Sequence, residues 1–225
     1  MLLSKAQVND EANFMRRIKT NLQHLFILLL FFSVPVLSEQ EAAEGALQDP
    51  YQKIEQVTSE LLMIIEKHKV SFEENENAYF EDIDQLLNRH VDFPYIAKKV
   101  MGNYGKKASL EQKSEFAETF RNGLVETYGR GLIGYTNEKI VLLPRSEIKN
   151  GQRVVAVKQE IHTSDAVYPL EYTVAKKKTG EWKVINMIIN GINLGKTFRN
   201  QFLNSAKKAG GDIDQVIDGW SSKPS

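Results

Sequence analysis

The chain has 225 residues, of which 42% are hydrophobic and 26% are charged, so it can bury one sizeable core. Its 29 lysines and arginines balance its 29 aspartates and glutamates, so no large basic field is expected that would attract the protein to nucleic acid or to an anionic membrane. Cysteine is absent, which excludes disulfides, thiolate metal sites, a cysteine nucleophile and a lipidated N-terminal cysteine.

The N-terminal segment has the pattern of a secretory signal. Arg16, Arg17 and Lys19 precede an apolar run over residues 25–37, which Pro35 interrupts. A helix that spans a bilayer takes about 20 apolar residues, and this run is shorter. Residues 1–38 are therefore predicted to be a cleaved signal peptide that directs export to the periplasm. The alternative is an uncleaved membrane anchor.

The segments around the folded part are predicted from composition. Met15 stands directly before the two arginines and is an alternative start of the chain. Residues 39–48 are acidic and alanine-rich, which is typical of a flexible leader. Residues 49–221 are expected to form a single domain, followed by a tail at 222–225. Residues 1–38 contain four basic and two acidic residues, so the remainder has a net charge of about −2.

Helical periodicity and capping signals dominate the first half of the domain. Asp49-Pro50 is an N-cap followed by a first-turn proline, and Asp92 caps a short helix that ends at Gly102. Between them, Tyr79, Ile83, Leu86 and Leu87 indicate another helix. Ser109 and Gln112 make a capping box for a long helix, whose apolar stripe is Phe116, Phe120, Leu124, Tyr128 and Leu132.

From Tyr135 the apolar period changes to two, which indicates strands. Strands are predicted at 139–143, at 153–163, around 168–174 and at 182–189. The last is apolar on both faces, which predicts a central position in the sheet. Two helices follow, one ending at Gly210-Gly211 and one capped by Asp212. Helices followed by a four-stranded antiparallel sheet and closing helices indicate an α+β fold.

A glycine-rich stretch at residues 129–134 matches G-x-G-x-x-G, the pattern of dinucleotide-binding loops. That motif follows a strand and opens a helix, so that helix N-terminal amides meet the pyrophosphate. Here the glycines end a long helix and precede a strand. They are therefore predicted to terminate the helix and to allow close packing.

The remaining titratable residues carry no recognisable catalytic pattern. His68, His90 and His162 have no metal-ligand partner at helical or turn spacing, so each is expected to be solvated or locally hydrogen-bonded. The lysine run at 176–178 falls at a hairpin turn, where lysines protect a sheet edge or add solubility. The alternative role of that run is contact with lipid head groups or with an acidic partner.

Two longer stretches resemble a known family. They are DFPYIAKKVMGNYGKKASLEQKSEFAETFRNGLVETYG, which begins at Asp92, and WKVINMIINGINLGKTFRNQF, which begins at Trp182. They resemble the MlaC family of periplasmic phospholipid-transport proteins, also called toluene-tolerance proteins, in their order and spacing. The signal peptide, the DPY at Asp49 and the absence of cysteine also fit that family. The resemblance extends over nearly the whole domain.

The resemblance implies an NTF2-like α+β fold that holds acyl chains in an apolar pocket between sheet and helices. It also implies the partners: diacyl phospholipid, the outer-membrane lipoprotein MlaA with its porin, and the inner-membrane Mla ABC transporter. Such a carrier would maintain the lipid asymmetry of the outer membrane. It makes and breaks no bond, so neither enzyme activity nor a cofactor is expected.

The lining of the pocket is predicted from helical and strand periodicity. The inward residues are expected to be Val100, Phe116, Phe120, Leu124, Tyr128, Val155, Val157, Leu170, Tyr172, Ile188 and Phe198. A register error of one residue would turn the predicted residues of a strand to the opposite face of the sheet.

Two other functions compete with the lipid carrier. One is a small-molecule isomerase or dehydratase on the same fold, which needs an acid or base inside the pocket. The other is an adaptor with a filled core and no ligand.

The signal-peptide interpretation predicts the N-terminus of the mature protein. N-terminal sequencing of protein from the periplasm should find a start close to Glu39, because the apolar run is too short to anchor the chain. A mature protein that retains residues before Leu25 would contradict it.

Overall fold

The two longest helices begin at their predicted caps in the computed structural model, which describes residues 49–136 and 138–220. Helix α2 (Pro50–His68) starts with a capping box between Asp49 and Gln52, and α6 (Leu110–Leu132) with one between Ser109 and Gln112. The predicted signal peptide (1–38), leader (39–48) and tail (222–225) lie outside the described residues.

The other helices are shorter and follow the predicted pattern with one addition. Asp92 caps α4 by accepting a hydrogen bond from the backbone of Tyr95, and the helix ends at Gly102, whose φ is 59°. A single turn, α5, was not predicted. The bounds are α3 (Glu76–His90), α4 (Phe93–Met101), α5 (Tyr104–Lys107), α7 (Leu194–Lys208) and α8 (Ile213–Asp218). None of the helices in the described part is long and apolar enough to cross a membrane.

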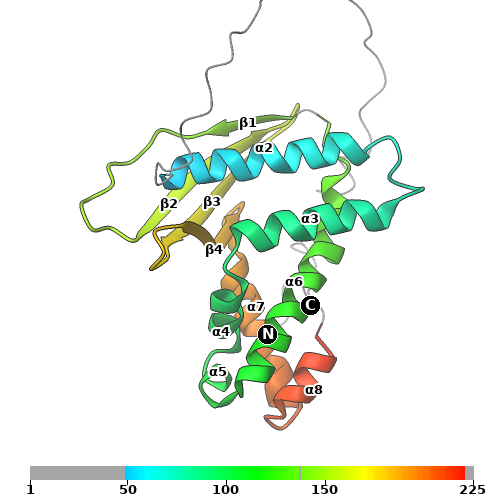
Figure 1. Ribbon diagram of the computed structural model, residues 1–225, viewed down its shortest axis with the longest axis vertical. Helices are drawn as coiled ribbons and strands as arrows, with labels where there is room; N and C mark the ends of the chain where they lie inside the picture. The colour runs from blue at the N-terminus through cyan, green and yellow to red at the C-terminus, as the bar shows by residue number, and fades with distance from the viewer. Residues whose placement is uncertain (1–48, 137, 221–225) are drawn as a thin grey trace, which may run out of the picture. The chain divides into compact units, whose positions relative to one another are not determined.

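The strands form one antiparallel meander in sequence order, which confirms the α+β class (Figure 1). Their bounds are β1 (Lys139–Leu142), β2 (Val154–His162), β3 (Val167–Lys176), β4 (Trp182–Ile189) and β5 (Ile192–Asn193). The fifth strand, two residues beyond a tight turn at Asn190-Gly191, was not predicted. The expected central position of β4 is wrong, because β3 is central. β4 is apolar on both faces because helices from both the first and the last part of the chain, including α2 and α7, pack against it.

A β-bulge in β4 changes which of its side chains point inward. Val184 pairs with Val174 and Asn186 pairs with Thr173, so Ile185 is an extra residue opposite the junction of two partners. After Ile185, the side chains that share the face of Val184 therefore lie at odd-numbered instead of even-numbered positions.

Buried apolar side chains form three clusters. The first joins α4, α6, α7 and α8, the second lies between α2 and the sheet, and the third joins α2, α3 and α6. Leu87 packs against the first and third clusters, and Val91 against the first and second. The three clusters therefore meet around the C-terminal end of α3.

The junction after α3 also connects the helices to the sheet through polar contacts. Val91 bridges to Val184 of β4, and the Asp92 amide donates to the Val184 carbonyl at 2.9 Å. The buried Asp92 carboxylate accepts from the Lys177 ammonium at the β3–β4 hairpin. These contacts fix the position of α3 and α4 against one edge of the sheet.

The caps allow a stability prediction with an internal control. Ser109→Ala removes a side-chain acceptor from the first turn of α6 and should lower the free energy of unfolding by about 1 kcal/mol. Asn75→Ala, at the start of α3, should cost less, because Asn75 makes no side-chain cap hydrogen bond. Chemical denaturation measures both, and equal losses would contradict the assigned role of the Ser109 cap.

Candidate functional site

The predicted lining residues on helices lie mostly in the helical cluster. Phe116 and Phe120 of α6 are 0% and 1% exposed and are packed by other rings: the centroid of Phe116 is 4.8 Å from that of Phe202, and Phe120 is 5.1 Å from Phe198. Val100 of α4 is buried in the same cluster. These four predicted residues, Val100, Phe116, Phe120 and Phe198, are thus packed as core in this structure.

Leu124 and Tyr128 lie farther along the same stripe of α6, one and two turns beyond Phe120. They pack against the margin of the helical cluster and keep part of their surface accessible. Of the predicted helical residues, these two are therefore the ones with surface left for a ligand.

Four predicted strand residues share one face of the sheet. Val157 pairs with Tyr172, and in the same ladder Val155 and Leu170 follow at intervals of two residues. α2 covers this face, since Tyr51 and Ile54 belong to the same cluster as Val155 and Val157. The predicted common orientation of Val155, Val157, Leu170 and Tyr172 is confirmed, whereas their contact with lipid remains a prediction.

Ile188 does not share that face. It pairs with Glu171, whereas Met187 pairs with Tyr172 and occupies the inner position assigned to Ile188. The bulge at Ile185 is the cause, because an extra residue reverses the alternation that the prediction extended from Trp182. The inner face near the end of β4 is therefore formed by Met187 and Ile189.

The two halves of the predicted lining belong to different clusters. α6 packs mainly against α3, α4 and α8, whereas the strand residues pack under α2. Tyr172, Met187 and Ile189 of the inner face keep partial exposure, although β3 is the central strand. Burial raises the pKa of the Tyr172 phenol, so this side chain combines a deep position with accessible surface. The inner face of the sheet therefore keeps accessible apolar surface at these three positions.

A buried polar network that sequence patterns did not predict connects α2 and α3. The Lys53 ammonium lies 3.1 Å from Nδ1 of His90, and Nε2 of His90 lies 3.2 Å from a carboxylate oxygen of Glu60. An ammonium has only donors, so Nδ1 accepts and Nε2 carries the proton that is donated to Glu60. Neutral His90 thus connects a cation to an anion.

Burial explains the titration of this network. It lowers the pKa of His90 below its ordinary value, although the hydrogen bond to Glu60 acts in the opposite direction. Burial also lowers the pKa of Lys53. Although burial acts to raise it, hydrogen bonds from His90 and Arg89 leave the pKa of Glu60 below its usual range.

The histidine expectations need correction. His68 and His90 are 5% and 3% exposed, and both bond to partners on the neighbouring helix rather than to local groups. Nε2 of His68 lies 2.6 Å from Asp82. His162 is locally bonded to Glu160, as expected. The partners of His68 and His90 are far away in sequence, so local spacing could not identify them.

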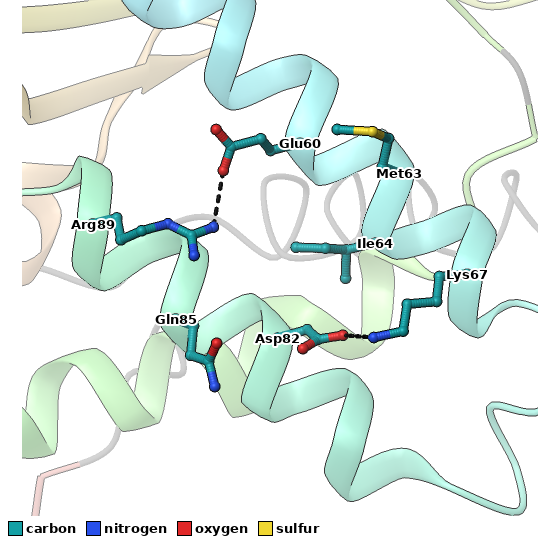
Figure 2. Close-up of a pocket in the computed structure, with 7 residues that line it drawn as sticks. All are labelled: Glu60, Met63, Ile64, Lys67, Asp82, Gln85 and Arg89. Atoms are coloured by element: carbon teal, nitrogen blue, oxygen red, sulfur yellow. Dashed lines mark hydrogen bonds and ion pairs between the residues drawn. The ribbon is translucent and has the colours of Figure 1, made fainter. Parts of the chain in front are cut away.

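A polar cleft of about 240 Å³ opens between α2 and α3 (Figure 2). Ion pairs cross it at two places: Arg89 to Glu60 at 2.9 Å and Lys67 to Asp82 at 2.7 Å. The lining residues are Glu60, Met63, Ile64, Lys67, Asp82, Gln85 and Arg89. None of the predicted lipid-contacting residues lines this cleft, and its charges differ from the predicted apolar container.

The glycine-rich stretch ends α6 and allows close packing, as predicted. A Cβ atom at Gly129 would lie 3.1 Å from the Phe80 ring, and the Gly129 carbonyl accepts a hydrogen bond from the Tyr79 hydroxyl at 2.8 Å. The lysine run has partly structural contacts, since Lys177 pairs with Asp92 and Lys176 lies over the Trp182 ring. Over residues 49–136 and 138–220, no group of three or more acidic or histidine side chains could hold a metal ion.

Comparisons with known proteins agree on one family. The MlaC protein family model matches residues 55–222. Toluene tolerance protein Ttg2D of Pseudomonas putida is 35% identical over 198 residues, covering 88% of each chain. The intermembrane phospholipid transport system binding protein MlaC of Haemophilus influenzae is 27% identical, covering 87% of this chain and 91% of its own.

A solved structure has the same fold. It is the phospholipid-binding protein from Ralstonia solanacearum in complex with a phospholipid, with a TM-score of 0.69 and 23% sequence identity. The match covers 76% of this chain and 94% of that one. The likeness confirms the architecture described above.

The buried histidine predicts a pH dependence of stability. Because the pKa of His90 is lower in the folded than in the unfolded chain, the unfolded state binds more protons as the pH falls below about 6.5. Stability should therefore be full above that pH and decline below it. His90→Gln should flatten this decline in denaturation curves between neutral and mildly acidic pH. The same series with His162→Gln is the control, and an unchanged slope in the His90 variant would contradict the assignment.

Proposed function

Because the chain belongs to the MlaC family, we propose that it is a periplasmic phospholipid carrier that shuttles lipid between the outer membrane and an inner-membrane ABC transporter. Its partners on this proposal are the lipoprotein MlaA with its porin on one side and the Mla ABC transporter on the other. In this role it helps to maintain the lipid asymmetry of the outer membrane. The relative from Haemophilus influenzae is named as a phospholipid transport binding protein, which supports the assignment.

The observation that carries the proposal is the accessible apolar surface on the inner face of the sheet. Tyr172, Met187 and Ile189 keep accessible surface on the inner face of the sheet, and Leu124 and Tyr128 do so on α6. In a closed core such side chains would be almost fully buried. We infer that acyl chains occupy the space bordered by these residues and complete the packing.

The energetic reason for such a container follows from the cargo. A diacyl lipid has on the order of 30 methylenes, and burying each is worth about 0.8 kcal/mol, so exposure of the tails in water would cost more than about 20 kcal/mol. An aqueous compartment is therefore crossed with the tails enclosed and the head group in solvent. A carrier of this kind holds its ligand without a chemical step.

The polar groups on the inner face support a carrier rather than an isomerase or dehydratase. Gln159 is held by hydrogen bonds to Thr58, at 3.0 and 3.3 Å, and an amide does not titrate. Burial raises the pKa of the Tyr172 phenol, which makes it a poorer acid near neutral pH. We infer that the protein is not an enzyme.

Two tryptophan substitutions test the lining. Leu124→Trp puts a ring into partly open space, so it should lower co-purifying phospholipid several-fold and leave the melting temperature of lipid-free protein nearly unchanged. Val157→Trp is the matched contrast, because Val157 is 0% exposed. Overpacking there should destabilise the lipid-free protein by about 1 to 3 kcal/mol.

Mass spectrometry of denatured extracts measures the cargo of each variant and of the unmodified protein. Diacyl phospholipid is the expected ligand of the unmodified protein. A small polar metabolite, or no ligand after gentle purification, would contradict the carrier function. If Leu124→Trp protein kept its full lipid content, the assignment of Leu124 to the lining would be wrong, and the carrier function would stand.

A further inference from the structure

Basic residues gather on α4, α5 and α7, in two stretches of the sequence that contain no acidic residue. Residues 93–110, which form α4, α5 and the approach to α6, contain four lysines and no acidic residue. Residues 190–211, which include α7, contain three lysines and one arginine and again no acidic residue. The two segments hold eight of the chain's 29 basic residues and none of its 29 acidic residues, so its neutral total conceals a marked local excess.

The two segments lie together in the fold. α4 packs against α7, and a guanidinium nitrogen of Arg199 donates to the carbonyl of Lys99 at 2.8 Å. The ring of Tyr104 in α5 lies 6.3 Å from that of Phe202 in α7. Figure 1 shows α4, α5 and α7 side by side. We call their charged residues the basic side: Lys98, Lys99, Lys106, Lys107, Lys196, Arg199, Lys207 and Lys208.

The charges of the basic side are not neutralised within the described part of the chain. None of the eight residues forms an ion pair there, and the seven lysines are exposed. At the contacts of α3 with α2 and α6, by contrast, Lys67, Arg89 and Arg121 each pair with a carboxylate of the neighbouring helix. The basic side therefore presents net positive charge to solvent.

Large apolar side chains are exposed close to these lysines. Leu110, three residues after Lys107, is 85% exposed at the first turn of α6. Tyr95 of α4 is 39% exposed, and the Lys99 ammonium lies 5.3 Å from the centroid of its ring. Lysines interspersed with exposed apolar and aromatic side chains are typical of surfaces that lie on a lipid–water interface.

We propose that the basic side docks on the surface of a bilayer that contains anionic phospholipid. Lysine is depleted in interfaces between proteins, where arginine is preferred, and seven of the eight residues here are lysines. A bilayer surface instead rewards each nearby cation separately, by about fivefold in affinity per lysine. Such binding is reversible and weakens with salt, as a carrier that must leave the membrane requires.

Co-sedimentation with vesicles tests the docking. The purified protein should bind vesicles of phosphatidylcholine mixed with phosphatidylglycerol at low salt, and should bind phosphatidylcholine vesicles far less. High salt should release it. A variant with Lys98→Gln, Lys99→Gln, Lys106→Gln and Lys107→Gln should bind the anionic vesicles at least tenfold more weakly, because four cations are lost from the contact.

The matched control removes the same charge elsewhere. Lys69→Gln, Lys139→Gln, Lys149→Gln and Lys158→Gln alter four exposed lysines outside the basic side and outside the lysine run at 176–178, so the net charge of the two quadruple variants is identical. The control should retain its vesicle binding to within about twofold. Equal losses in both variants, or no binding of the unmodified protein at low salt, would overturn the proposal.

Two further readouts separate the alternatives. Phospholipid that co-purifies with the unmodified protein and with each variant is measured in parallel. If the unmodified protein carries its normal phospholipid but does not bind the anionic vesicles, the membrane contact is refuted and the carrier function stands. If the basic-side variant binds vesicles normally but no longer cross-links to an acidic protein, the basic side serves a protein partner and the membrane proposal is wrong.

Discussion

Asp92 is the residue on which the joining of helices and sheet depends. Its backbone amide donates to Val184 of β4, one carboxylate oxygen caps α4, and the other accepts from Lys177 at the β3–β4 hairpin. The side chain is almost buried, so an unpaired carboxylate there would be costly. Because Val91 beside it touches two apolar clusters, the same short segment also sets the distance between the helical cluster and the sheet. The space proposed for acyl chains depends on that distance.

Local signals in the sequence predicted most of the fold. The capping boxes at Asp49 and Ser109 and the change of apolar period after Tyr135 depend on neighbours within a few residues, and the structure contains all of them. The strand face of Val157 and Tyr172 was also predictable, because alternation holds along both strands. Short elements such as α5 and β5 have too few residues to produce a period.

The errors at the candidate site have non-local causes. The bulge at Ile185 depends on how β4 pairs with β3, and no feature of Trp182 to Ile189 alone reveals it. Lys53, Glu60 and His90 come together only when α2 packs on α3, so their network was invisible as a spacing pattern. The aromatic packing of Phe116 and Phe120 likewise requires α7, which lies some 80 residues farther along the chain.

The short outermost strands of the sheet bear on the self-association of the protein. β1 has four residues and β5 has two, whereas the three strands between them have eight to ten. A long free strand edge is a template on which a second chain can add by backbone pairing. The two outermost strands of this sheet therefore offer few backbone groups to a second copy of the chain.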